Sequence, residues 1–170
     1  VEVDVEPDGW VAAGDDFILD LWVLDTYGNQ VELDIEGDDA PVFTDAFGAE
    51  NTVSCAWDGL LEGEGTKRFR CTATRAEEDK IINVVVRGVS GETDPFDVVN
   101  GPLAHVDVSV GSSPVVAGEM VHLGFVAWDA YENPYIEQHS GAVLDVSDHS
   151  NSLDVTSITL DEDGVGESNS

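Results

Sequence analysis

The 170-residue sequence predicts an all-β protein made of two β-sandwiches in tandem, the second of them incomplete. One observation behind this prediction is a segment that occurs twice, at 13–29 and 117–133. A period of roughly 100 residues is the length of one sandwich domain. Another observation is that apolar and polar residues alternate along short segments, as they do in half-buried strands. A third is that no segment shows a sustained helical period with capping residues.

Both copies of the repeated segment follow one plan, in which a turn precedes a strand and a second turn follows it. The strand has an apolar face made of Phe17, Leu19, Leu21 and Val23 in the first copy and of Val121, Leu123, Phe125 and Ala127 in the second. The second turn has the pattern Asp-x-Tyr-x-Asn, formed by Asp25, Tyr27 and Asn29 and again by Asp129, Tyr131 and Asn133. We call these two segments the Asp25 turn and the Asp129 turn.

The two turns admit a structural and a functional interpretation. In the structural one, the aspartate and asparagine side chains hydrogen-bond to turn backbone, Gly28 supplies a positive φ, and Tyr27 packs over the end of the sandwich. Glu132 stands where the first copy has Gly28, so the second turn must form without glycine. The functional alternative makes Asp25 and Asp129 calcium ligands at a domain junction. The structural interpretation is favoured, because the pattern recurs where a turn must recur.

The first domain is expected to span residues 1–100. Its strands are indicated by alternation or by β-branched residues, and they are expected at 1–6, 17–24, 31–36, 52–57, 67–74, 81–87 and 96–99. The glycine-rich segment 58–65 predicts a loop and the charged segment 75–79 a turn. Residues 100–102, Asn-Gly-Pro, predict a linker too short for independent tumbling of the two domains.

The second domain, residues 101–170, is expected to be incomplete. Besides the repeated strand it has strand candidates at 106–110, 143–146 and 155–160, and its last ten residues resemble the loop at 58–65. Three strand segments that follow this loop in the first domain then have no counterpart. Three explanations stay open: the chain is a segment of a longer array, a neighbouring subunit supplies the missing strands, or the second domain is smaller and closes differently.

The charge balance is extreme, with 36 acidic against 6 basic residues and a net charge of −30. Nucleic acid and anionic membranes are therefore not expected as partners, because both require a cationic surface. Such self-repulsion favours a setting where salt or calcium screens it, either extracellular or halophilic. The alternative is an acidic coat that keeps the protein in solution. No apolar run reaches the roughly 18 residues that a spanning helix requires.

All six basic residues fall within the window 67–87. A cationic patch containing Lys67, Arg68 and Arg70 on an anionic body is a candidate docking surface for another copy of the chain. The alternative is that these side chains balance nearby acids such as Glu77 and Glu78.

Trp22 and Trp128 are expected to project from the face of their strands opposite the core. Outward aromatic residues on an acidic sandwich indicate a covered surface, either a neighbouring domain, another subunit or a sugar. A loop of the same domain is the alternative. We include both tryptophans among the candidate self-association residues.

Cys55 and Cys71 are the only cysteines. Each shares strand parity with apolar neighbours, so both are expected to face the core of the first domain. Two cysteines without a matching histidine spacing do not make a structural zinc site. A disulfide between them would contribute roughly 3 kcal/mol and would suit an exported protein. Two reduced, buried thiols are the alternative.

No catalysis is expected and no cofactor is required. Asp15, Asp16, Asp38 and Asp39 are weak candidates for a Ca²⁺ site between domains, although no segment has the spacing of an EF-hand loop. Four histidines lie in the second half of the chain, but no nucleophile-elbow pattern accompanies them.

The Ala-Gly-Asp/Glu start, the alternating strand and the Asp-x-Tyr-Gly-Asn turn together resemble bacterial immunoglobulin-like repeats. These repeats build invasin- and intimin-type adhesins and other large surface proteins. The resemblance covers both halves and implies seven-stranded immunoglobulin-like sandwiches, an extracellular structural or adhesive role, and no active site.

These observations lead us to expect a non-enzymatic protein of the cell surface, either a subunit of a filament or the stalk of an adhesin. Its expected partners are other copies of itself or neighbouring repeats, with a cell-surface receptor or glycan as a further possibility. The alternative is a carbohydrate- or calcium-binding module of a larger secreted protein.

Overall fold

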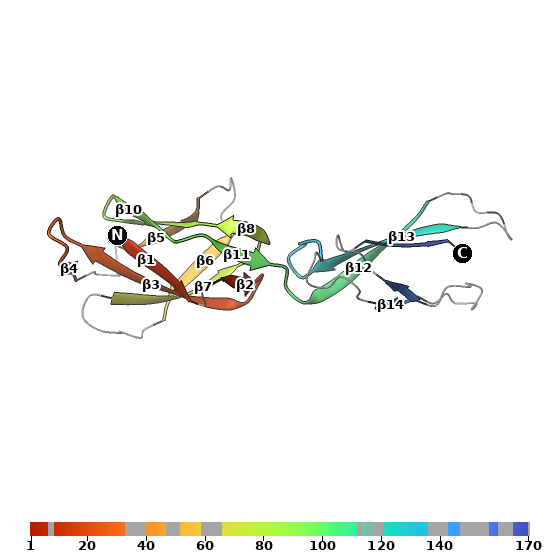
Figure 1. The fold of residues 1–170 in the computed structure, drawn as a ribbon, viewed down its shortest axis with the longest axis horizontal. Coiled ribbons are helices and arrows are strands. Elements are labelled where there is room, and N and C mark those ends of the chain that lie inside the picture. The colour runs from red at the N-terminus through yellow and green to blue at the C-terminus, as the bar shows by residue number, and fades with distance from the viewer. Residues whose placement is uncertain are drawn as a thin grey trace. The chain divides into compact units, whose positions relative to one another are not determined.

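The computed structural model describes residues 1–6, 9–32, 40–46, 52–58, 66–111, 114, 116, 121–135, 143–146, 157–159 and 165–169. Within this part of the chain the regular structure consists of β-strands alone, which confirms the all-β prediction. The chain divides into two compact units, Val1–Val99 and Asn100–Ser170, which we call unit 1 and unit 2 (Figure 1). Each unit is described by itself.

Unit 1 contains eleven of the described strands. They are β1 (Glu2–Glu6), β2 (Trp10–Ala12), β3 (Asp16–Leu24), β4 (Gln30–Val31), β5 (Val42–Asp45), β6 (Val53–Trp57), β7 (Thr66–Ala73), β8 (Glu77–Lys80), β9 (Ile82–Val86), β10 (Val89–Glu92) and β11 (Phe96–Val99). The main sheet has the order β1-β3-β7-β6, with β4 paired to β3. That order matches the A-B-E-D sheet of an immunoglobulin sandwich. Two further sheets have the orders β10-β9-β5 and β2-β11-β8.

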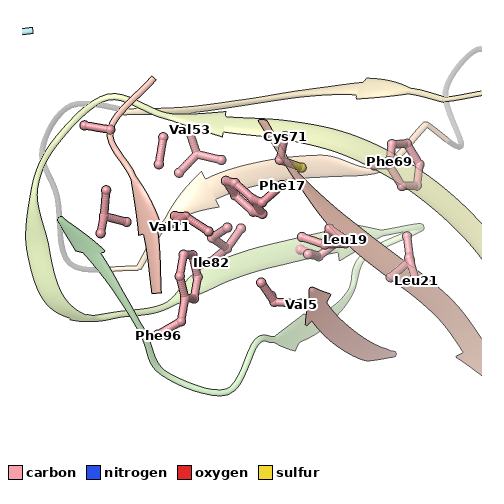
Figure 2. Close-up of a cluster of buried hydrophobic side chains, with 14 of the residues drawn as sticks. Val5, Val11, Phe17, Leu19, Leu21, Val53, Phe69, Cys71, Ile82 and Phe96 are labelled. Carbon is pink, nitrogen blue, oxygen red and sulfur yellow. The ribbon is translucent and has the colours of Figure 1, made fainter. Parts of the chain in front are cut away.

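The core of unit 1 is built from the inner faces of these sheets (Figure 2). Strand β3 alternates as predicted, because Phe17, Leu19 and Leu21 are buried while the residues between them are partly exposed. Phe17 packs against Phe96 of β11 with ring centroids 5.5 Å apart, which joins strands of two different sheets. The repeated strand is therefore the centre of the unit's packing.

The disulfide between Cys55 and Cys71 is present, and it joins directly paired positions of β6 and β7. Cys71 is fully buried and Cys55 is partly buried against the core. The bond thus cross-links two neighbouring strands of one sheet. In antibody domains, by contrast, the conserved disulfide joins the two sheets.

Unit 2 contains β12 (Leu103–Val110), β13 (His122–Asp129), β14 (Val143–Asp145), β15 (Ser157–Thr159) and β16 (Val165–Asn169). One sheet has the order β12-β13-β16, and β14 pairs with β15. Phe125, Ala127 and Ile158 are its buried hydrophobic residues among those described. Unit 2 thus repeats the β1-β3-β7 arrangement, since β12 pairs with β13 as β1 pairs with β3.

The prediction that residues 161–170 are a loop is wrong for Val165–Asn169. These residues form β16, which pairs antiparallel with β13 and takes the position that β7 has beside β3. The described part of unit 2 therefore holds a counterpart of one strand that the sequence had suggested was missing. It holds no counterpart of β9 or β11.

Four other segments differ from expectation. The predicted turn at 75–79 is wrong from Glu77 onward, because Glu77–Lys80 form β8 and pair with β11. Strands β2, β5 and β10 were not predicted. The predicted strand at 31–36 begins within β4, while residues 33–36 lie outside the described residues.

Candidate functional site

The Asp25 and Asp129 turns have the same hydrogen-bonded core. In the first, the backbone N–H groups of Tyr27 and Asn29 donate to Oδ1 of Asp25 at 2.8 and 2.9 Å. In the second, those of Tyr131 and Asn133 donate to Oδ1 of Asp129 at 2.8 and 2.9 Å. In both turns the asparagine Nδ2 also donates to Oδ2 of the aspartate, at 2.9 and 2.8 Å. The aspartate thus satisfies the donors of its own turn, as the structural interpretation predicts.

Each turn also needs a residue with positive φ. Gly28 has a φ of 82° and Glu132 a φ of 64°, so the second turn adopts the same left-handed conformation with a side chain that disfavours it. Tyr27 is 89% exposed. The expectation that its ring packs over the end of the sandwich is therefore wrong.

The hydrogen bonds lower the pKa of both carboxyl groups. For Asp25 the side chain and backbone of Asn29 are the main causes. For Asp129 burial acts first and in the opposite direction, but donors from Asn133, Gly101 and Tyr131 outweigh it. Both aspartates are consequently charged acceptors, and charged acceptors form stronger hydrogen bonds than neutral ones.

The two turns differ in what else the carboxylate holds. Oδ2 of Asp129 accepts the backbone N–H of Gly101 at 2.9 Å, and Asp129 is 0% exposed. Gly101 is the second residue of unit 2 and is itself buried. Asp25 is exposed, and none of the described residues outside its own turn donates to it. The Asp129 turn therefore anchors the segment that enters its unit.

A second contact holds the same entering segment. Burial raises the pKa of the Tyr135 hydroxyl, and the nearby backbone of Leu103 acts in the opposite direction. The backbone N–H of Tyr135 donates to the carbonyl of Ala127 at 3.0 Å, which places this residue beside the repeated strand. Gly101 and the backbone of Leu103, the first residue of β12, thus lie against Asp129 and Tyr135.

The tryptophans predicted to face outward are held by acids of the neighbouring strand. Nε1 of Trp22 donates to Glu2 at 2.6 Å, and Nε1 of Trp128 donates to Asp107 at 3.0 Å. Trp128 also stacks on His105, with centroids 6.4 Å apart. Both indoles are partly buried by these neighbours of their own units.

Most of the basic side chains in the window 67–87, which we call the cationic window, interact with residues of unit 1. Arg68 makes a two-pronged ion pair with Asp20, at 2.8 and 2.6 Å. Arg70 pairs with Asp58 at 3.2 Å and more loosely with Asp16 at 3.5 Å. Nζ of Lys67 lies 5.7 Å from the centre of the Trp57 ring. These contacts favour local charge balance over a docking surface. The acids that pair with the two arginines are Asp20, Asp58 and Asp16, not the predicted Glu77 and Glu78.

Lys80 forms a buried polar cluster that the sequence did not reveal. Its ammonium donates to Asp45 at 2.7 Å, to Thr52 at 3.1 Å and to Glu77 at 3.2 Å, and the lysine side chain is 0% exposed. Thr52 donates in turn to Asp45 at 2.7 Å. The cluster ties β8 to β5 and to the start of β6.

The calcium candidates are only partly covered by the structure. Asp38 and Asp39 lie outside the described residues. Asp16 accepts hydrogen bonds from Thr72 and Arg70, and Asp15 is exposed. Within the described ranges no three acidic, histidine or cysteine side chains are grouped as metal ligands. The calcium site stays a prediction. None of the described residues belongs to a helix long and apolar enough to cross a membrane.

The fold is similar to that of solved bacterial surface proteins. An Escherichia coli adhesin, FdeC, superposes with a TM-score of 0.54 at 19% identity, over 99% of this chain and 54% of that one. The immunoglobulin-like fold is confirmed. Weaker likenesses are the Yersinia pseudotuberculosis adhesin InvE, with a TM-score of 0.46, 15% identity, 99% of this chain and 50% of that one, and domains 5–6 of the S-layer protein SbsC, with a TM-score of 0.38, 14% identity, 100% and 83%.

This chain spans about half the length of the two adhesin structures. No protein-family model matches the sequence, and no curated protein does either.

Proposed function

We propose that this chain is part of a non-enzymatic extracellular protein, the stalk of an adhesin or a subunit of a cell-surface filament. The observation that carries the proposal is the similarity of its fold to an adhesin over 99% of its length. The internal repeat supports it, because two units with the same central strand and the same turn are a modular design.

The mechanism we propose is mechanical. Extension along the chain is resisted by antiparallel ladders, such as the seven paired positions of β3 and β7. The disulfide between β6 and β7 adds a covalent link in the same sheet. In unit 2 the anchored segment at Gly101 limits how freely the chain can move where it enters the sheet.

The extracellular location is supported by two further observations. A disulfide persists in oxidising compartments and is rare in reducing ones. A net charge of −30 gives an anionic surface that disfavours binding to nucleic acid or to anionic lipid. Adhesion would then occur through a receptor or a glycan, or through further copies of the chain.

Filament formation requires surfaces that join copies. The paired arginines make the cationic window a weaker candidate than the sequence suggested. Unit 2 offers a different one, because Val108 and Val110 are more than half exposed on β12. Among the described strands β12 also lies at the edge of its sheet, and an exposed edge strand can pair with a strand of another copy.

Labelling of intact cells with an antibody against this chain tests the surface location, with a cytoplasmic protein as control. Sedimentation of the purified chain at low and high salt, with and without calcium, tests self-association. The stalk is favoured by a surface-exposed monomer and the filament by ordered polymers. Labelling that appears only after cell lysis would contradict both.

One observation favours a carbohydrate-binding alternative. Trp10 is 57% exposed and Trp57 is 37% exposed, and aromatic rings stack on sugars. A glycan array comparing the wild type with Trp10→Ala and Trp57→Ala tests this. Sugar binding by the wild type that is lost in either variant would favour a carbohydrate-binding module. An absence of wild-type binding to every glycan would count against such a module.

A further inference from the structure

The exposed Asp25 turn differs from its counterpart in the internal repeat. Its counterpart, the Asp129 turn, has the same hydrogen bonds but also accepts the N–H of Gly101. The turn residues of unit 1 are consistently more exposed than those of unit 2. Tyr27 is 89% exposed against 44% for Tyr131, and Asn29 is exposed whereas Asn133 is buried. The same acceptor is thus occupied in one unit and open to solvent in the other.

The strand registers give the position in unit 1 that corresponds to Gly101 in unit 2. In unit 1 Val3 pairs with Leu21, and in unit 2 Val108 pairs with Phe125, the counterpart of Leu21 in the repeat. Val1 therefore corresponds to Val106. The position equivalent to Gly101 lies five residues before Val1.

We propose that the Asp25 turn is a docking site for the backbone of a segment entering unit 1 ahead of β1, with Oδ2 of Asp25 accepting one N–H five residues before Val1. The partner is an extended peptide segment of the kind formed by residues 100–105. The inference rests on the proposed role in a tandem array, in which each turn fastens the segment that joins its unit to the one before.

The chemistry of the site is suited to this partner. The hydrogen bonds from Asn29 and Tyr27 use mainly Oδ1 and one lone pair of Oδ2, so Oδ2 can accept a further donor. The two carboxylate oxygens of Asp129 together accept four hydrogen bonds. The counterpart of Tyr135 is Val31, whose side chain cannot accept a hydrogen bond, so the anchor in unit 1 consists of Asp25 alone.

The test adds the entering segment to the full chain. Residues 100–105, Asn-Gly-Pro-Leu-Ala-His, are copied ahead of Val1, and amide hydrogen exchange of the added glycine is measured by NMR. We expect its exchange to be slowed at least about 10-fold relative to a free peptide, as one hydrogen bond to a carboxylate would do. In the Asp25→Ala variant that protection should disappear, whereas Asp94→Ala, which removes an exposed carboxylate elsewhere in unit 1, should leave it unchanged.

Gly101 of the same molecule is the internal reference for a glycine whose amide donates to an aspartate carboxylate. The proposal is overturned if the added glycine exchanges at the free-peptide rate, or if its protection survives Asp25→Ala. Protection that appears only with added calcium would also overturn it, in favour of a metal site. These outcomes are independent of antibody labelling on intact cells, so the docking site and the surface role can fail separately.

Discussion

The backbone N–H of Gly101 donates to the carboxylate of Asp129 across 28 residues of sequence, at 2.9 Å. The carboxylate is completely buried, and the other donors it holds all belong to its own turn. A repeated turn and the segment that enters the unit are therefore one structural element.

The stability of unit 2 should depend on the ionisation of Asp129. The pKa of Asp129 in the folded chain is below the ordinary value of 3.8. The ionised carboxylate therefore contributes its full stabilisation at pH values above 3.8. That contribution is lost as the pH falls through the folded value. Urea unfolding followed by unit 2 amide signals should show a stability gap between wild type and Asp129→Asn that is constant near neutrality and shrinks in acid. A gap independent of pH would contradict this.

Replacing Glu132 by glycine should stabilise unit 2 by about 1 kcal/mol, because a side chain at positive φ is strained. The reciprocal change Gly28→Glu should destabilise unit 1 by a similar amount, since Gly28 has the same conformation. Thermal unfolding of both variants checks the pair. Loss of stability in Glu132→Gly would show that the His105 contact at 3.8 Å outweighs the strain.

Lys80→Met should destabilise unit 1 by about 3–5 kcal/mol, because it leaves the nearly buried Asp45 carboxylate without its cation. Lys67→Met is the matched control, since the Lys67 ammonium forms no ion pair among the described residues and lies 5.7 Å from the centre of the Trp57 ring. This change should cost less than about 1 kcal/mol. Urea unfolding followed by β7 amide signals measures both. Equal effects in the two variants would contradict a structural role for the buried cluster.

Reduction of the disulfide should lower the stability of unit 1 by about 3 kcal/mol, because Cys55 and Cys71 close a loop with a sequence separation of 16. Unit 2 has no cysteine and should be unaffected, so it serves as the control within the same chain. Unfolding with and without reductant, followed by amide signals of each unit, makes the comparison. A change confined to unit 2, or none in unit 1, would refute it.

The longer strands were predictable because their alternation of apolar and polar residues extends over many positions. Strand β3 has nine residues, and its alternation with one buried face is visible without a structure. Strands β2, β5 and β10 have only three or four residues, too few for a period to be distinguished from a loop. Short strands form where a neighbour pairs with them, and that neighbour lies elsewhere in the sequence.

Strand β8 shows how tertiary context overrides local composition. Its sequence Glu-Glu-Asp-Lys is fully charged and predicts an exposed turn. Pairing with β11 and the burial of Lys80 against Asp45 make it a strand instead. The Asp45 partner is 35 residues away, so neither sequence spacing nor propensity reveals it.

The turns were predictable, but the anchoring contact of the Asp129 turn was not. The repeated Asp, Tyr and Asn indicated self-contained turns, which the structure contains. The bond to Gly101 depends on the pairing of β12 with β13, whose register shifts between Leu103 and His105. A shift of this kind has no clear signal in one sequence, and only the comparison of two units in one chain shows that Asp25 has an open acceptor.

Amide hydrogen exchange of Gly101 in the full chain tests the anchoring role most directly. In the wild type the amide should be protected, and in Asp129→Ala its exchange should accelerate at least about 10-fold while the Phe125 amide in the centre of β13 stays protected. That result would show that the turn holds the entering segment. Exchange at Gly101 that is unchanged by Asp129→Ala would contradict the account.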